Sequence, residues 1–205
     1  VKLMNRFYDV SRGSIEINGV DIRKYNLESL RTQIGYVAQK AHMFKGSIQS
    51  NICFGKPDAS EEEMVHAATI AQASDFILKR EHGYEDEIAE DGTNISGGQK
   101  QRLSIARVIL KKPSLYIYDD SFSALDFKTD ATLRKALKPV VKNAIFFVVA
   151  QRISTIMDSD MIIVLDEGQI IGMGTHAELL KDCSVYQEIA HSQLTQKELD
   201  DYERN

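Results

Sequence analysis

The sequence has little of what would define a disulfide-rich, membrane-spanning or nucleic-acid-binding protein. Its two cysteines, Cys53 and Cys183, are isolated and lack metal-site spacing, so we expect reduced cytosolic thiols and no disulfide. The longest apolar run, residues 144–150, is far shorter than the ~20 residues of a membrane span. The net charge of −5 argues against a nucleic-acid-binding surface, so no nucleic-acid partner is expected.

The rest of the composition is that of a globular protein. The 205 residues are 43% hydrophobic and 27% charged, which is enough for one domain with a sizeable core. No internal repeat or low-complexity linker divides the chain.

The most informative stretch is residues 94–107. Ser96, Gly97 and Gly98 lead into a helical pattern whose apolar face contains Leu103, Ala106 and Leu110. The serine can cap the helix, and the glycines let another group approach the backbone. Because the first amides of a helix lack internal partners and its dipole is positive there, the stretch predicts an anion site.

This stretch resembles the signature motif of the ABC ATPases, whose core reads Leu-Ser-Gly-Gly-Gln. Here Ile95 replaces the leucine, while Ser96, Gly97, Gly98 and Gln99 match. The resemblance implies that these four residues contact a nucleotide held by a second ABC domain.

A second stretch places two acids at the end of an apolar strand. Residues 115–118 are continuously apolar, as in a strand buried on both faces of a parallel sheet, and Asp119 and Asp120 follow. The carboxyl ends of such strands form the ligand crevice of open α/β sheets. Buried carboxylates are costly unless paired, which favours a metal or catalytic role.

Further motifs follow in the order of the ABC family. By this resemblance Asp119 holds Mg²⁺ through water, Asp120 takes the place of the catalytic glutamate, and Asp126 ends the D-loop. Gln39 begins the Q-loop, which reaches the Mg²⁺ and the attacking water. Gln151 stands where the family has a histidine that contacts the terminal phosphate.

Two of these positions depart from the family pattern together. Asp120 is one methylene shorter than glutamate, and Gln151 lacks the imidazole's shape and its ability to become cationic. The signature motif is otherwise intact. With this pair of changes the chain resembles the weak-site subunit of a heterodimeric ABC exporter. Such a subunit binds ATP but hydrolyses it slowly, and it completes the competent site of its partner.

The local patterns along the rest of the chain predict ordinary elements. Residues 13–22 predict a hairpin around Asn-Gly, and a short helix capped by Asn26 should bury Leu27 and Leu30. Residues 57–80 are helical, with a Ser60–Glu63 capping box. The later expectations are a helix ending near Pro139, a buried strand at 145–149, further strands at 161–165 and 169–171, a capping box of Thr175 with Glu178, a structural His176, and a surface tail over 196–205.

The beginning of the sequence suggests a fragment. Residues 1–7 have an apolar helix pattern that resembles the helix after the family's phosphate-binding loop, and the loop itself, Gly-x-x-x-x-Gly-Lys-Ser/Thr, is absent from the chain. We therefore expect an N-terminally truncated domain that by itself binds ATP poorly.

The predicted fold is α/β: a P-loop NTPase (RecA-like) core with a mostly parallel sheet, an ABC helical subdomain and an N-terminal antiparallel β hairpin. We expect a single ABC ATP-binding domain over 1–205, with the helical subdomain at 41–112, the ATPase core at 1–40 and 113–190, and a tail at 191–205.

The implied function is Mg-ATP binding and hydrolysis between two such domains that meet head to tail. The expected partners are a second, different nucleotide-binding domain and the transmembrane domain of an exporter, at the cytoplasmic face of the plasma membrane. Segments 43–52 and 87–92 resemble exporter segments that face that domain, although Asp91 replaces an arginine. An ordinary homodimeric exporter ATPase and a soluble regulatory ABC protein are the alternatives.

Overall fold

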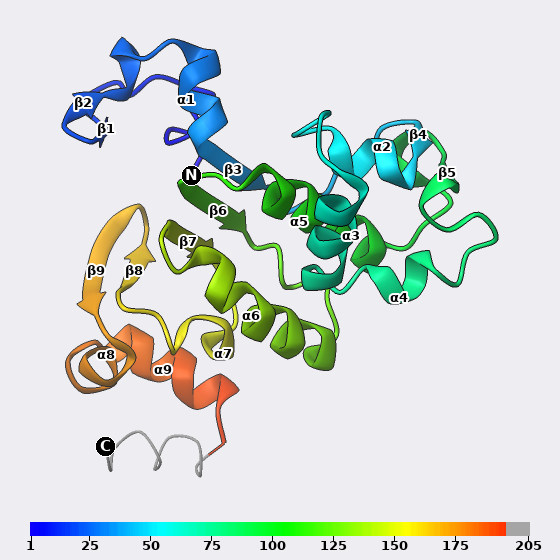
Figure 1. The fold of residues 1–205 in the computed structure, drawn as a ribbon. Helices are drawn as coiled ribbons and strands as arrows, with labels where there is room; N and C mark the ends of the chain where they lie inside the picture. Colours follow the sequence, from blue (N-terminus) through cyan, green and yellow to red (C-terminus); the bar gives the residue numbers. More distant parts are fainter. Residues whose placement is uncertain (196–205) are drawn as a thin grey trace. The chain divides into compact units, whose positions relative to one another are not determined.

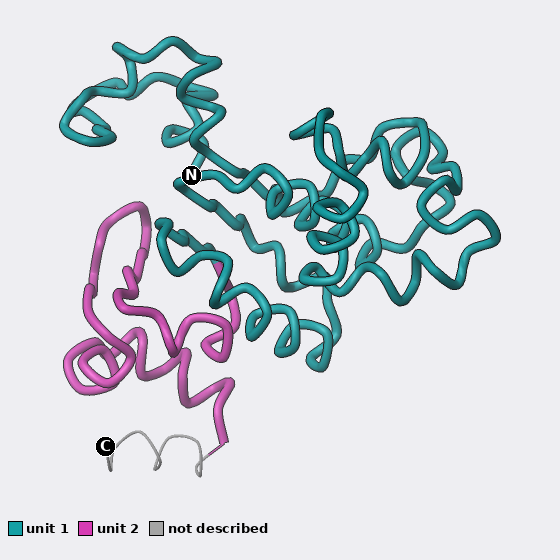
Figure 2. Tube along the Cα trace, viewed as in Figure 1, with its two compact units in different colours: residues 1–149 teal, residues 150–205 magenta. Residues whose placement is uncertain are grey.

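The computed structural model describes residues 1–195. They form two compact units, residues 1–149 and residues 150 onward (Figure 2). The surface tail expected over 196–205 lies outside the described residues.

The first unit contains the parallel sheet that the sequence predicts. Strands β3 (Ile34–Val37), β6 (Leu115–Asp119) and β7 (Ile145–Val149) run parallel in the order β3-β6-β7 (Figure 1). β6 is the central strand, and its residues from Tyr116 to Tyr118 are buried. This explains its continuous apolar run, since both faces of the strand are covered.

The prediction that β7 is buried is wrong. Ile145 is 67% exposed and the other four residues of the strand are half-buried. In the first unit β7 pairs with β6 along one edge only, so its apolar side chains are less covered than those of the central strand.

The hairpin near the N-terminus is confirmed. Strands β1 (Glu16–Ile17) and β2 (Val20–Asp21) pair through a turn in which Asn18 and Gly19 both have positive φ, 52° and 75°. The short helix η1 (Ile22–Lys24) follows, and then α1 (Leu27–Gln33), whose N-cap is Asn26 as predicted. Leu30 is buried, but Leu27 is 42% exposed, because the first turn of α1 presents that side chain outward.

The predicted helix over residues 1–7 does not form. This segment makes successive turns, with hydrogen bonds from the Met4 amide to the Val1 carbonyl and from the Phe7 amide to the Lys2 carbonyl. Arg6 has a φ of 50°, and such a left-handed residue ends any right-handed helical path.

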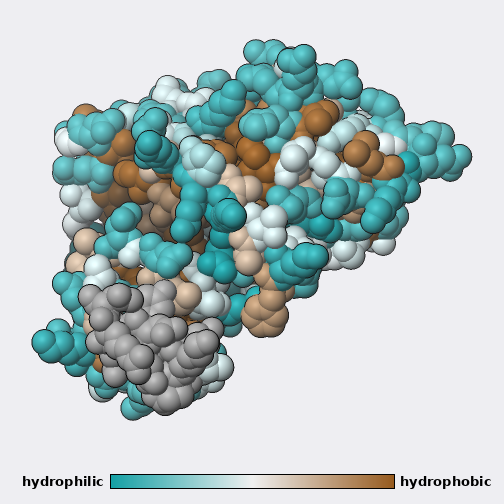
Figure 3. All heavy atoms as spheres, turned by 60° about the horizontal axis from the view of Figure 1, so that its bottom comes forward, coloured by the Kyte–Doolittle hydropathy of each residue, from teal (hydrophilic) through white to brown (hydrophobic). Residues whose placement is uncertain are grey.

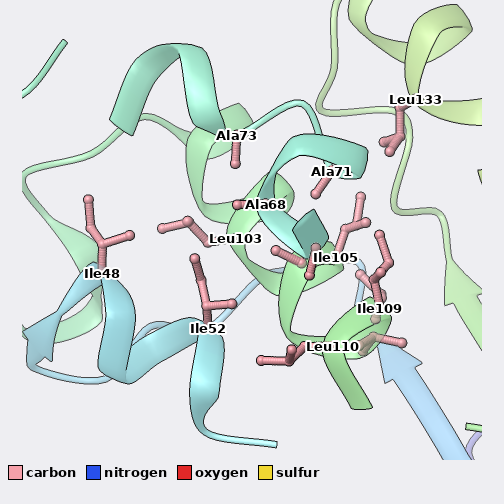
Figure 4. Packing of buried hydrophobic residues seen from close by; sticks show 14 of the residues in the cluster. Ile48, Ile52, Ala68, Ala71, Ala73, Leu103, Ile105, Ile109, Leu110 and Leu133 are labelled. Carbon is pink, nitrogen blue, oxygen red and sulfur yellow. The ribbon is translucent and has the colours of Figure 1, made fainter. Parts of the chain in front are cut away.

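The helical part of the first unit contains its largest hydrophobic core. Helices α2 (Ile48–Cys53), α3 (Glu61–Ile70), α4 (Ser74–Ile77) and α5 (Gly97–Lys111) surround it. Figure 4 shows side chains from α2, α3 and α5 meeting there, with Leu103 buried between helices. Complete burial of one such leucine contributes about 1.5–3 kcal/mol.

Small elements connect these helices. Strands β4 (Gly46–Ser47) and β5 (Glu87–Ile88) form an antiparallel pair, and the short helices η2 (Gly83–Glu85) and η3 (Glu90–Gly92) flank β5. The predicted Ser60–Glu63 capping box is present. The helix expected over 57–80 is instead divided into α3 and α4, because Gln72 between them has a φ of 57°.

Helix α6 (Phe127–Val141) continues past the position where the sequence predicts its end. Pro139 lies inside the last turn. A proline there removes one hydrogen bond, but its fixed φ is compatible with the helix, which continues for two residues.

The second unit is an antiparallel hairpin followed by two helices. Helix α7 (Ile153–Ile156) precedes β8 (Ile162–Asp166) and β9 (Gln169–Gly174), which are joined by a turn with positive φ at Glu167 and Gly168. Helices α8 (His176–Asp182) and α9 (Ser184–Gln193) complete it, and the Thr175–Glu178 capping box is present. Thus α9 covers the first residues of the tail expected at 191–205.

The surface of the described residues is mixed in polarity. Figure 3 shows hydrophobic side chains exposed among hydrophilic ones on the face that it presents. Cys53 and Cys183 are both free cysteines. Within residues 1–195 no helix combines the length and the apolarity needed to cross a membrane.

Candidate nucleotide site

The last residue of β6 contacts the neighbouring strand through its side chain. The Tyr36 hydroxyl in β3 donates a hydrogen bond of 2.9 Å to Asp119 Oδ2. Burial, together with this hydrogen bond and the Asp119 charge, raises the pKa of Tyr36 to about 12. Tyr36 is therefore protonated at neutral pH and holds one carboxylate oxygen of the predicted metal ligand.

The second acid contacts the predicted Q-loop residue. Gln39, two residues after β3, donates from Nε2 to Asp120 Oδ2 across 3.0 Å. Asp120 has a φ of 47°, in the left-handed region that aspartate tolerates better than most residues. Its amide donates to the Val149 carbonyl at the end of β7, so the acid is attached to both neighbouring strand ends.

Two further polar residues, which the sequence reading did not single out, fix this end of the sheet. Ser121 Oγ, fully buried, donates to the Val37 carbonyl at 3.1 Å. Gln101 Nε2, also buried, donates to the Ala38 carbonyl at 3.1 Å. Polar residues that are buried at such positions need a partner, and Gln101 links α5 to the chain just before Gln39.

The predicted anion site lies at the start of α5, a 15-residue helix. Ser96 is the N-cap: its Oγ accepts from the Gln99 amide at 3.3 Å, and Gln99 Oε1 accepts from the Ser96 amide at 3.0 Å. The Ser96 hydroxyl still has a hydrogen to donate. Among the described residues, no acceptor is hydrogen-bonded to the amides of Gly97 and Gly98. The first amides of any helix lack internal partners, so these two can donate to an anion.

The two signature glycines differ in the space around them. A Cβ on Gly98 would lie 3.2 Å from the Ala124 carbonyl oxygen, so the D-loop segment packs closely against the helix start. A Cβ on Gly97 would meet nothing within 4 Å. Packing within this chain therefore leaves little room for a side chain at Gly98 but leaves open space at Gly97.

The remaining predicted residues lie elsewhere. Asp126 is the N-cap of α6, and its carboxylate accepts from the Thr129 amide at 3.0 Å, which lowers its pKa. Gln151 belongs to the second unit, where its carbonyl accepts a hydrogen bond from Gln193. The structure thus brings together Gln39, Asp119 and Asp120 and groups Ser96 to Gln99 at one helix end.

The donor set fits a hydrated Mg²⁺ ion and a phosphate group. Mg²⁺ prefers oxygen ligands and keeps several waters, so it needs only one or two carboxylates from the protein. Asp119 would supply such a carboxylate, and Gln39, hydrogen-bonded to Asp120, would supply an amide that reaches the ion and its water.

Comparison with known proteins decides the family. The family described as "ABC transporter" matches residues 1–123, which is more than half of the chain. The chain belongs to the ABC transporter family. Its fold class, an α/β ABC ATPase domain, agrees with that membership, which places it among the P-loop ATPases.

Individual relatives of this ABC chain are longer proteins. The Bacillus subtilis protein with the name "Putative multidrug export ATP-binding/permease protein YgaD" is 47% identical over 92% of the chain and 33% of the relative. Heavy metal tolerance factor 1 of Caenorhabditis elegans is 41% identical over 96% of the chain and 25% of the relative. The chain therefore spans about one third or less of these relatives' length.

A solved structure agrees with the same family. A bacterial Atm1-family ABC exporter with ATP bound matches with a TM-score of 0.92 and 38% sequence identity, over 95% of this ABC chain and 34% of that one. At this identity the likeness supports membership of the ABC family as well as the fold.

Proposed function

We propose that this chain is an ATP-binding domain of an ABC exporter and couples Mg-ATP binding and hydrolysis to export across the membrane. The observation that carries the proposal is the grouping of Gln39, Asp119 and Asp120 at the carboxyl ends of β3 and β6. The exporter relatives support the reaction class, and their length supports a transmembrane domain as a partner.

In this proposal the residues divide into two groups. Asp119 would hold Mg²⁺ through water, and the bound ion would supply charge neutralisation at the phosphate oxygens. Gln39 and Asp120 orient the attacking water, with Gln151 near the terminal phosphate of the same nucleotide. Ser96, Gly97, Gly98 and Gln99 serve the nucleotide of a second ABC domain, and Asp126 ends the loop that contacts that domain.

We further propose that the chain's own site is weakly hydrolytic and that its partner is a different ABC chain. The aspartate at position 120 is shorter than glutamate by one methylene, and a misplacement of about 1 Å can cost on the order of a hundredfold in rate. Its left-handed backbone and its bond to Gln39 fix the shorter carboxylate in place. The proposed location is the cytoplasmic face of the plasma membrane.

The experiment is steady-state ATP hydrolysis by the complete gene product assembled with its partner. Asp120→Ala should leave most of the turnover, because the competent site uses the catalytic acid of the partner and not Asp120. Ser96→Ala should remove nearly all of it, because Ser96 completes that competent site. Equal losses would contradict the unequal pair and favour the homodimeric exporter, as would robust turnover by the gene product alone.

A further inference from the structure

We infer that Tyr36 is a positioning residue for Asp119, and that it sets the orientation in which this carboxylate meets Mg²⁺. The inference rests on the proposed function and extends it to a residue that has no place in the motifs. Its starting point is the 2.9 Å hydrogen bond from the Tyr36 hydroxyl to Asp119 Oδ2.

The register of the sheet explains why the two residues meet. Tyr36 is paired with Ile117, and side chains on paired positions of adjacent strands point to the same face. Asp119 lies two residues beyond Ile117 and so shares that face. The length of a tyrosine spans this offset, whereas the neighbouring Gly35 and Val37 belong to the opposite face.

The position of the hydroxyl is fixed by packing. The Tyr36 ring contacts the Phe7 ring edge to face, with centroids 5.7 Å apart. Tyr36 also packs against the buried cluster that contains Leu30, Ile34 and Ile117. A ring held by a strand on one side and an aromatic contact on the other keeps its hydroxyl at a defined point.

The Asp119 carboxylate has few other constraints. Within residues 1–195, Tyr36 is the one side chain that is hydrogen-bonded to it. The bond occupies Oδ2 and leaves Oδ1 to accept from metal-bound water. Partners that orient a metal-binding carboxylate typically change metal affinity or activity by about 10- to 100-fold when they are removed.

The test separates this role from simple packing. Tyr36→Phe keeps the ring and its contact with Phe7 and removes only the hydroxyl. Tyr25→Phe is the matched control, because the Tyr25 hydroxyl is also half-buried and donates at 3.0 Å to the Ile17 carbonyl, away from the acids. Both variants are made in the complete gene product, and their unfolding is compared first.

The measurement is calorimetric binding of a non-hydrolysable ATP analogue with Mg²⁺ and with EDTA. For Tyr36→Phe we expect the gain in affinity that Mg²⁺ confers to fall by about tenfold. The affinity in EDTA should remain that of the unmodified protein, and Tyr25→Phe should change neither value.

An unchanged Mg²⁺ gain in Tyr36→Phe would overturn the inference. So would an equal loss with and without Mg²⁺, because that result would place Tyr36 in packing or in nucleotide binding rather than at Asp119. If the unmodified protein itself shows no Mg²⁺-dependent binding, the proposed function fails and the inference fails with it.

Discussion

Gln39 Nε2 and Asp120 Oδ2 lie 3.0 Å apart, although 81 positions separate the two residues in the sequence. This hydrogen bond joins the end of β3 to the turn after β6. It holds the amide that we assign to the Q-loop against the acid that we assign to hydrolysis. The reach of the Asp120 side chain is therefore set by a contact as well as by its length.

Lengthening that acid should increase hydrolysis. In the assembled protein we expect Asp120→Glu to raise turnover at this chain's own site by about 10- to 100-fold, because the added methylene moves the carboxylate outward by about 1 Å. Single-turnover hydrolysis, with the partner's acid removed, measures this site alone. Asp119→Glu is the matched control and should lower the rate, and an unchanged rate in Asp120→Glu would contradict the weak-site assignment.

Alanine substitutions at the two signature glycines should have different effects, one on stability and the other on ATP hydrolysis. Gly98→Ala places a Cβ 3.2 Å from the Ala124 carbonyl oxygen and should lower the free energy of unfolding by about 1 kcal/mol, as overpacking does. Gly97→Ala meets open space and should leave unfolding unchanged, but it should impair hydrolysis at the partner's nucleotide. Denaturant unfolding and ATPase assays check the pair; normal ATPase activity in Gly97→Ala would argue against a ligand there.

The hydroxyl of Tyr118 should be a cost to stability. It is buried, and among residues 1–195 no group accepts a hydrogen bond from it or donates one to it. Because an unsatisfied buried hydroxyl costs about 1–3 kcal/mol, Tyr118→Phe should be neutral or more stable by up to that amount. Tyr25→Phe, which removes a satisfied hydroxyl, should instead lose about 1 kcal/mol. Denaturant titration of both variants decides, and clear destabilisation of Tyr118→Phe would contradict the prediction.

The parallel sheet and the helix starts could be predicted from sequence because they depend on local rules. The apolar run of β6, the Asn18-Gly19 turn and the Ser60–Glu63 capping box each carry their own signal. The places where helices break or end could not be predicted. Gln72 adopts positive φ without being glycine, and Pro139 remains inside a last turn that tolerates it.

The site was predictable as a set of motifs but not as a set of contacts. Asp119 and Asp120 follow from their position at the end of an apolar strand, and Gln39 follows from the family resemblance of the segment after it. Tyr36 does not, because a tyrosine in a short strand is usually core. Its role depends on the register between β3 and β6, which no local pattern specifies. The one sequence signal for Tyr36 was that its hydroxyl lies in the strand just before Gln39.

His176 should make the second unit sensitive to acid. It is buried at the start of α8, and its Nδ1 lies 2.7 Å from the Tyr186 hydroxyl. Burial lowers its pKa from the ordinary value of 6.5, while the Asp158 carboxylate opposes the shift. A histidine with a lowered pKa contributes stability that is present above its unfolded pKa and is lost as pH falls through the folded one.

Stability should therefore fall when the pH is lowered from about 7.5 to about 5. His176→Phe removes the titrating group and should flatten this dependence, whereas the same change at exposed His191 should not. Unfolding followed by denaturant at several pH values measures the slope. An identical slope in His176→Phe and the unmodified protein would contradict the assignment.

The most direct test of the account is a structure of the complete gene product assembled with its partner and bound to Mg-ATP. We predict that Ser96 Oγ and the amides of Gly97 and Gly98 contact the γ-phosphate of one nucleotide, while Asp119 and Gln39 of the same chain face the Mg²⁺ of the other. A nucleotide that contacts both Ser96 and Asp119 of a single chain, or neither, would contradict it.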